Sequence, residues 1–210
     1  MLTPLQRHVA LTVAGLPEAE GFALAGGAAL ILRGIVARTT RDLDFFGADG
    51  DAVERLVPVV EAAIRGEGLA VSTVRRAHGF ARLEIASGDA VTELDLAADA
   101  RLFPADVDTT VPMLSELELA VDKVLAVFGR AEARDFVDLA ALVARHDMET
   151  LLGLAHKKDG GFDRALFVEM LHRFDRLRSE EFDLAPGGHA RLRASVTQWA
   201  RSLGGNDPLL

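Results

Sequence analysis

Hydrophobic and polar positions follow two different periods along this chain. In the first half, short stretches alternate between apolar and polar residues, most clearly Asp42-Leu43-Asp44-Phe45-Phe46. Alternation with a period of two is typical of a strand that has one buried face. Further strands are predicted near residues 22–25, 69–75, 79–86 and 91–97. The first half is therefore predicted to contain a sheet.

Apolar positions at helical spacing fill most of the remaining sequence. Helices are predicted over residues 4–14, 28–33 and 51–65, and Thr3-Pro4 has the N-cap and first-turn proline that begin a helix. Ser115 is placed to cap another helix, and residues 115–128, 131–144 and most of 147–203 have a helical pattern. This order predicts an α+β fold, with a mixed α/β domain in residues 1–114 and a helical domain in residues 115–210.

The net charge of -9 limits the function classes. Residues 151–210 hold nine Lys/Arg and eight Asp/Glu, so the first 150 residues carry the acidic excess. A broad basic surface for nucleic acid is excluded, and any RNA contact has to come from a local basic patch. The chain has no cysteine, no signal peptide pattern and no long apolar run, which predicts a cytoplasmic protein outside the membrane.

Asp42 and Asp44 are the first candidate site residues. Residues two apart in a strand point to the same side, so both carboxylates project together. Two ionised carboxylates repel each other, and a divalent cation between them removes that cost. Magnesium prefers oxygen ligands, so the pair predicts a magnesium site. The same pattern also fits an edge strand with a solvated polar face.

Glu93 and Asp95 form a second alternating acidic pair. A third carboxylate beside Asp42 and Asp44 could complete a metal site and orient an attacking hydroxyl for phosphoryl transfer. Either Glu93 or Asp95 could supply it. A solvated strand face is an equally good interpretation of this pair from the sequence alone.

Gly26-Gly27 follows an apolar strand and precedes a helix. Glycine lets a backbone approach a phosphate closely, and a helix N-terminus offers unpaired N–H groups. The pair therefore predicts a contact with the phosphates of a nucleoside triphosphate. A glycine pair alone is more often a simple turn.

Several sequence blocks, taken in order, resemble a known family. The sequences are Gly-Gly-Ala-Ala-Leu at residues 26–30, Arg-Thr-Thr-Arg-Asp-Leu-Asp-Phe at 38–45, and Leu-Glu-Leu-Ala-Val-Asp-Lys at 117–123, followed by Arg-Asp-Phe-Val-Asp-Leu at 134–139. They resemble the AbiEii/AbiGii toxin family of nucleotidyltransferases. The resemblance implies a DNA-polymerase-β-like nucleotidyltransferase domain followed by a helical half.

The resemblance also implies roles for the residues of the first domain. Asp42 and Asp44 would bind Mg²⁺, with Asp95 as the third carboxylate. Thr40 and Arg41 would lie close to the triphosphate, together with the glycine pair.

Two residues of the helical domain would complete the active site. Lys123 would neutralise phosphate charge, and Asp138 would lie near it. A lone lysine or aspartate on a helix otherwise belongs to a solvated face. On this interpretation, Lys123→Ala is expected to weaken nucleotide binding more than it lowers stability.

The implied function is transfer of a nucleotide from an NTP to the acceptor end of tRNA. The family's members are the toxin halves of toxin–antitoxin and abortive-infection systems, so a cognate antitoxin protein is an expected partner. The alternative is a small-molecule nucleotidyltransferase of the aminoglycoside type, because an acidic surface suits a cationic substrate. A non-enzymatic binding module is a third interpretation, which the intact acidic residues and lysine argue against. Candidate cations for RNA are Arg38, Arg41, Lys157, Lys158, Arg164, Arg173, Arg176 and Arg178.

Overall fold

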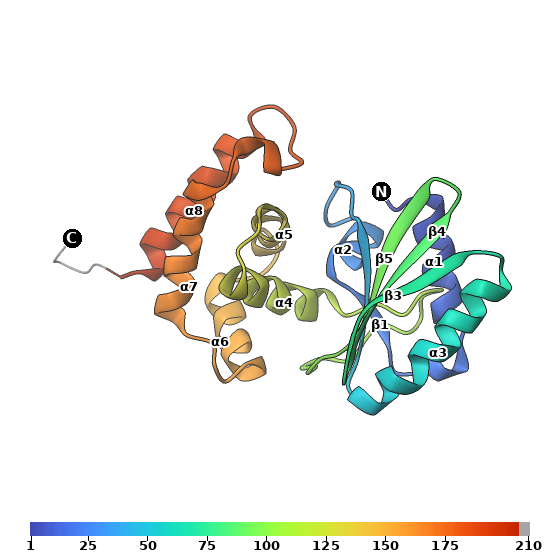
Figure 1. Cartoon of the computed structure of the whole chain (residues 1–210). Helices are drawn as coiled ribbons and strands as arrows, with labels where there is room; N and C mark the ends of the chain where they lie inside the picture. Colours follow the sequence, from blue (N-terminus) through green and yellow to red (C-terminus); the bar gives the residue numbers. More distant parts are fainter. Residues whose placement is uncertain (206–210) are drawn as a thin grey trace. The chain divides into compact units, whose positions relative to one another are not determined.

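The computed structural model describes residues 1–205 of the chain. It divides into two compact units, Met1–Glu118 and Leu119–Leu210. The first unit combines a sheet with helices, and the described part of the second is helical (Figure 1). The predicted α+β class is confirmed.

The first unit is built on a mixed five-stranded sheet. Its strand order is β1 (Ala23–Ala25), β2 (Asp42–Gly47), β5 (Ala90–Ala98), β4 (Phe80–Ser87) and β3 (Ala70–Ala77). β2 and β5 run parallel, and the other neighbouring strands are antiparallel. β2 lies inside the sheet, so the interpretation of its Asp-x-Asp as part of an edge strand is wrong.

Three α-helices accompany this sheet: α1 (Pro4–Ala14), α2 (Gly26–Leu32) and α3 (Gly50–Gly66). Thr3 caps α1, because its hydroxyl accepts the N–H of Gln6 at 3.1 Å and its own N–H donates to the Gln6 side chain. α2 begins at the glycine pair itself, two residues before the predicted start. The glycines therefore form the first turn of the helix and not a loop before it.

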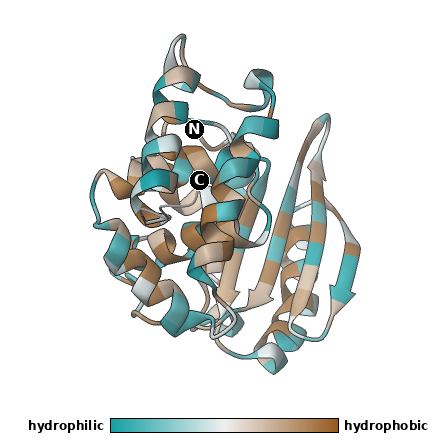
Figure 2. Cartoon of the chain, turned by 90° about the vertical axis from the view of Figure 1, so that its left-hand side faces the viewer, coloured by the Kyte–Doolittle hydropathy of each residue, from teal (hydrophilic) through white to brown (hydrophobic). Residues whose placement is uncertain are grey.

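Apolar side chains on one face of the sheet pack against α1 and α3. Every second residue of the inner strands points there, which gives the alternating colours along the strands in Figure 2. α3 contributes a matching stripe at helical spacing. The fully buried members are Leu43, Phe45, Leu83, Ile85, Leu94 and Leu96 from the strands and Val53, Leu56, Val60 and Ile64 from α3. The opposite face of the sheet is thereby left to carry polar side chains.

The second unit contains the rest of α4 (Glu116–Gly129), α5 (Ala133–Val143), α6 (Met148–Lys158), α7 (Arg164–Leu171) and α8 (Gly188–Leu203). The hydroxyl of Ser115 accepts the N–H of Glu118 at 3.2 Å, which confirms the predicted cap of α4.

Helix α8 packs against α5 and α7 around an aromatic cluster, in which the rings of Phe136 and Phe174 meet edge to face at 5.3 Å. No helix in residues 1–205 is long and apolar enough to cross a membrane.

Candidate active site

Strand β2 presents its two aspartates on the polar face of the sheet. Leu43 and Phe45 are buried in the core, and Asp42 and Asp44, which alternate with them, are half-buried on the other face. The hydroxyl of Thr40 donates to Asp42 Oδ1 at 2.7 Å. The predicted pairing of the two carboxylates on one side of the strand is confirmed.

Gly26 brings the first turn of α2 against the Asp44 carboxylate. Its φ is 57°, in the left-handed region that favours glycine. A Cβ at this position would lie 1.9 Å from Asp44 Oδ2. The space that holds the carboxylate therefore exists because residue 26 has no side chain, which links two residues that lie 18 positions apart in the sequence.

Gly27 makes room for a different side chain. A Cβ there would lie 2.5 Å from Nη2 of Arg38, whose side chain is buried and whose Nη1 donates to the carbonyl oxygen of Thr39 at 2.7 Å. The sequence had suggested Arg38 as a surface cation for RNA. That expectation is wrong, because the guanidinium fills the space beside the first turn of α2.

The close contact at Gly26 gives a testable prediction. Gly26→Ala is expected to displace the Asp44 carboxylate, and misplacement of a catalytic group by about 1 Å can cost about 10²-fold in rate. The matched control is Gly34→Ala, since Gly34 also has a positive φ, 68°, but a Cβ there meets no atom within 4 Å. Both variants carry a backbone strain of about 1–2 kcal/mol.

The measurement is nucleotide transfer by each variant, with urea unfolding to correct for stability. Loss of transfer in Gly26→Ala but not in Gly34→Ala is the expected result. Equal activity in the two variants would contradict a functional contact between Gly26 and Asp44.

Strand β5 places its acidic residues directly beside those of β2. In the parallel register Asp42 is opposite Glu93, and Asp44 is opposite Asp95. Asp95 is buried and binds Arg82 of β4 in a bidentate pair, Nε to Oδ1 at 2.7 Å and Nη2 to Oδ2 at 2.6 Å. The solvated-face interpretation of this strand is therefore wrong for Asp95.

Arg82 is a site residue that the sequence did not single out. Its hydrogen bond with Asp95, and then the charges of Asp95, Glu93 and Asp42, raise the pKa of the guanidinium above its ordinary value, against the opposing effect of burial. Its Nη1 also lies 3.3 Å from Glu93 Oε2. The sequence signal that could have indicated Arg82 was its polar position in an alternating strand, which neighbours the strand of Glu93 and Asp95.

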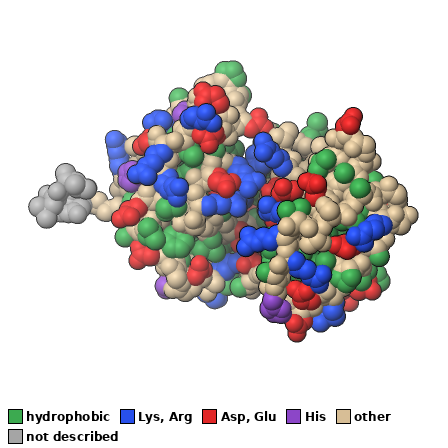
Figure 3. All heavy atoms as spheres, in the orientation of Figure 1, with side chains coloured by type: hydrophobic (Ala, Val, Ile, Leu, Met, Phe, Trp, Pro, Cys, Tyr) green, Lys and Arg blue, Asp and Glu red, His purple; other side chains and the backbone are tan. Residues whose placement is uncertain are grey.

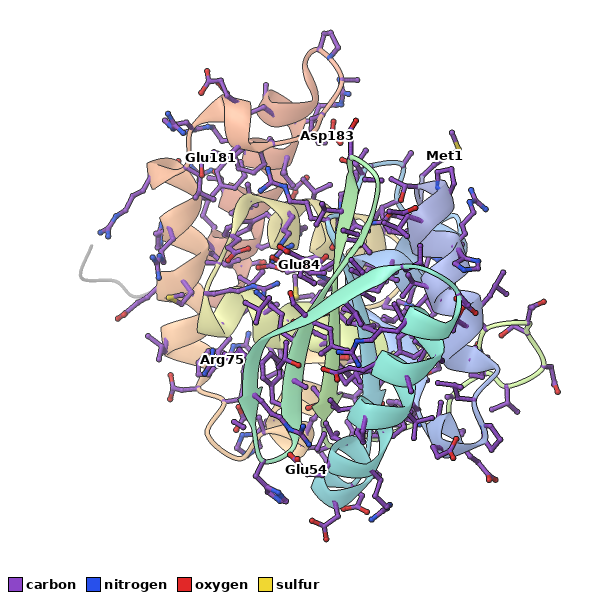
Figure 4. All side chains as sticks on the ribbon, turned by 45° about the vertical axis from the view of Figure 1, so that its right-hand side comes forward. Met1, Glu54, Arg75, Glu84, Glu181 and Asp183 are labelled. Atoms are coloured by element: carbon purple, nitrogen blue, oxygen red, sulfur yellow. The ribbon has the colours of Figure 1, made fainter. Side chains whose placement is uncertain are left out.

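The polar face continues across β4 and β3. Glu84 of β4 is opposite Glu93, and Arg75 of β3 is opposite Arg82, with its guanidinium over the Phe80 ring at 5.5 Å (Figure 4). Charges of both signs thus lie on the same side of the sheet as Asp42 and Asp44.

The carboxylates of β2 have the chemistry that a divalent cation needs. They are oxygen donors on one side of a strand, and the space beside Asp44 would be filled by any side chain at residue 26. Within residues 1–205, no three Asp, Glu or His side chains are grouped so that they could hold a metal ion. Both carboxylate oxygens of Asp95 accept hydrogen bonds from Arg82. The role of Asp95 as a third metal ligand therefore stays a prediction.

Lys123 and Asp138 meet in the interior of the helical unit. Lys123 Nζ lies 2.9 Å from Asp138 Oδ2 and 3.4 Å from Asp135 Oδ1, and all three side chains are buried. The interpretation of the lysine and aspartate as solvated helix positions is therefore wrong. Because two buried carboxylates depend on the ammonium group, Lys123→Ala is expected to lower stability as well as any nucleotide binding.

Asp135 is the second residue that the sequence left without a role. Arg130 binds it through Nε to Oδ2 at 2.8 Å and Nη2 to Oδ1 at 2.9 Å. Burial raises the pKa of Asp135, but the hydrogen bonds and charges of Arg130 and Lys123, with the N–H of Glu132, outweigh burial and hold the pKa below its ordinary value. The three-residue spacing of Asp135 and Asp138 on one helix face was the signal for a shared partner.

The structure also sorts the cations that the sequence suggested for RNA. The Lys158 ammonium is buried in an ion pair with Asp122, so its selection as a surface cation is wrong. Arg164 pairs with Glu149, Nη2 to Oε1 at 2.6 Å. Lys157, Arg173 and Arg176 are exposed.

Comparison with solved structures defines the class of the fold. A crystal structure from H. pylori named as a putative nucleotidyltransferase superposes with a TM-score of 0.59 at 20% identity, covering 95% of this chain and 93% of that one. JHP933 from Helicobacter pylori superposes with a TM-score of 0.57 at 20% identity, covering 95% and 90%. At this identity the likeness shows a shared fold.

The sequence then gives the family. The model of the family described as nucleotidyl transferase AbiEii toxin, type IV TA system, matches residues 13–208. The chain belongs to this family of nucleotidyltransferases. No curated protein matches the chain.

Proposed function

We propose that the protein transfers a nucleotide from an NTP to an RNA acceptor, the acceptor end of tRNA, and that its activity in the cytoplasm is restrained by a cognate antitoxin. The acceptor hydroxyl attacks the α-phosphorus, the bond to the β-phosphate breaks and pyrophosphate leaves. Family membership supports the reaction class and the toxin–antitoxin context.

The observation that carries the proposal is the Asp44 carboxylate in the space left by Gly26, next to Asp42 on an inner strand. We propose that these two carboxylates bind Mg²⁺, which when bound would offset the charge of the triphosphate. Thr40 fixes Asp42 through its 2.7 Å hydrogen bond. Arg82 fixes Asp95, the neighbour of Asp44 across β2 and β5.

The nucleotide roles of Gly26, Gly27, Thr40 and Arg41 belong to the same proposal. Gly26 and Gly27 lie where the backbone turns into α2, close to Asp44 and Arg38 respectively. Lys123 and Asp138 are proposed as functional residues on the strength of the family motif. Their burial together with Asp135 also supports a structural role, so the two roles have to be separated by experiment.

The test uses purified protein, Mg²⁺, total tRNA and each of the four NTPs labelled on the α-phosphate. Labelled RNA is expected with at least one nucleotide, and no labelled RNA with the same NTP labelled on the γ-phosphate. This pair of results separates nucleotidyl transfer from phosphoryl transfer, because the γ-phosphate leaves with pyrophosphate.

Two controls sharpen the outcome. Excess chelator is expected to stop the labelling, and added Mg²⁺ is expected to restore it. Labelling of a small aminoglycoside acceptor but not of RNA would overturn the proposal in favour of the antibiotic-modifying alternative.

A further inference from the structure

Helix α8 has an exposed face with an unusual charge pattern. The segment from Leu184 to Gly205 contains three arginines and no Asp or Glu, although the whole chain has 32 acidic residues and 23 Lys/Arg. Helix α3, which also has one buried and one exposed face, differs, since it carries Asp51, Glu54 and Glu61 together with Arg55 and Arg65. A mixed pattern such as that of α3 is ordinary for a solvated helix, and the pattern of α8 is not.

The exposed side of α8 also forms a shallow hollow of about 680 Å³. Its lining follows one helix face opposite the buried residues Leu192, Val196 and Ala200. We name this surface the α8 face, and its main members are Arg193, Ala194, Thr197, Gln198, Arg201 and Ser202. Figure 3 shows Lys and Arg side chains over the helical unit, interspersed with side chains of the other types.

A second hollow, of about 530 Å³, lies on the other side of the same helix. Thr197 and Arg201 line both hollows, and His172 and Asp175 line the second. Arg193 is held in place, with its guanidinium 5.6 Å from the centre of the Phe174 ring and Nη1 2.7 Å from Asp175 Oδ1. Arg201 therefore lies on a ridge that a ligand can approach from two sides.

We infer that the α8 face binds the phosphate backbone of RNA. Phosphates are contacted by arginine and by neutral donors such as Ser, Thr and Gln, which are the side chains of this face. Arg193 and Arg201 are eight residues apart, about 12 Å along the helix axis, so they can reach different phosphates.

The composition favours RNA over a protein partner. The α8 face has no large apolar side chain among its members, and protein interfaces depend on such anchors. The inference rests on the proposed function in one respect, that the acceptor is an RNA. It adds a binding surface in the helical unit, separate from the carboxylates of β2.

The test is direct binding of fluorescently labelled tRNA, measured by anisotropy over a range of KCl concentrations without NTP or Mg²⁺. The variant is Gln198→Glu/Arg201→Gln, which changes the net charge by two units and leaves the Arg193 contacts intact. The matched control is Arg55→Gln/Ala62→Glu on the exposed side of α3, with the same change in charge.

We expect the α8 variant to bind tRNA about tenfold more weakly and to lose about one unit of the salt slope, since one phosphate contact is removed. The α3 control is expected to bind like the wild type. Unchanged tRNA binding by the α8 variant, or an equal loss in both variants, would overturn the inference.

Further outcomes of these measurements separate this inference from its alternatives. If the wild type is a dimer by light scattering and the α8 variant is a monomer, the surface is a protein interface and the inference is wrong. If the wild type labels tRNA and the α8 variant binds it normally, the RNA surface fails while the proposed transfer stands. Absence of tRNA binding by a wild type that labels only a small cationic acceptor overturns both.

Discussion

Asp44→Asn is expected to lower nucleotide transfer by about 10³-fold, because loss of one preorganised charged group in an active site costs on this order. Asparagine keeps the shape of the side chain beside Gly26 and removes the charge that would hold a cation. The fold is expected to survive, since Asp44 is half-buried on the polar face and contributes nothing to the apolar core. The measurement is the rate of α-label incorporation at saturating NTP and Mg²⁺.

Asp89→Asn is the matched control, since Asp89 is an exposed residue in the turn between β4 and β5. It is expected to transfer nucleotide at the rate of the wild type. Activity of Asp44→Asn close to that of the control would remove the β2 carboxylates from the mechanism, whatever the acceptor is.

The second large effect concerns the buried ion cluster of the helical unit. Lys123→Ala is expected to lower the free energy of unfolding by about 3–5 kcal/mol, because it leaves Asp135 and Asp138 buried with one cation fewer. Lys157→Ala, on an exposed position of α6, is the control and is expected to change stability by under about 0.5 kcal/mol.

A single tryptophan, Trp199 in α8, makes this measurement specific to the helical unit. α8 packs against α5, which carries both aspartates, so urea unfolding followed by Trp199 fluorescence reports on the cluster. A double-mutant cycle with Asp138→Ala is expected to give a coupling energy of about 0.5–3 kcal/mol. Additive effects would show that the 2.9 Å ion pair does not stabilise the unit.

Acid provides an independent check of the same cluster. The pKa of Asp135 is lowered in the folded protein, so its ionised form stabilises the fold above the ordinary aspartate pKa of about 4, and this stabilisation is lost as pH falls through the folded-state pKa. The deficit of Lys123→Ala relative to the wild type is therefore expected to shrink in acid. A deficit that stays constant down to about pH 3 would point to lost packing instead of lost charge.

A separate readout distinguishes a nucleotide role of Lys123 from this structural role. Lys123→Arg keeps the charge and is expected to retain most of the stability. If both Lys123→Arg and Lys123→Ala bind NTP with the affinity of the wild type, and Lys123→Ala differs only in its lower stability, the lysine acts through the fold. A lower NTP affinity in a stable Lys123→Arg would support direct contact with phosphate.

Local sequence determined much of this protein. The period of two in β2 places Asp42 and Asp44 on one face and Leu43 and Phe45 in the core, because side-chain direction in a strand depends only on position. Thr3 and Ser115 cap their helices by accepting the backbone N–H of the residue three positions later. Order and spacing of the motif blocks also identified the family, which the match over residues 13–208 confirms.

Tertiary structure decided the partners of each charged group. Whether β2 was an edge or an inner strand depends on β1 and β5, which lie far away in the sequence. Arg82 reaches Asp95 across a strand pair, although the sequence had not singled it out, and Arg38, suggested as a cation for RNA, is buried beside Gly27. Lys123 and Lys158 are likewise buried in ion pairs with residues that the fold brings next to them.

The difference has a physical cause. The direction of a side chain and the cap of a helix arise from bonds between near neighbours, so the sequence by itself determined them. The burial and pairing of a charge depend on which distant segment supplies the counter-charge and excludes water, and only the folded chain brings those segments together. The sequence of β2 by itself thus identified the acidic pair. The space for Asp44 beside Gly26 and the pairing of Asp95 with Arg82 depend on the folded sheet.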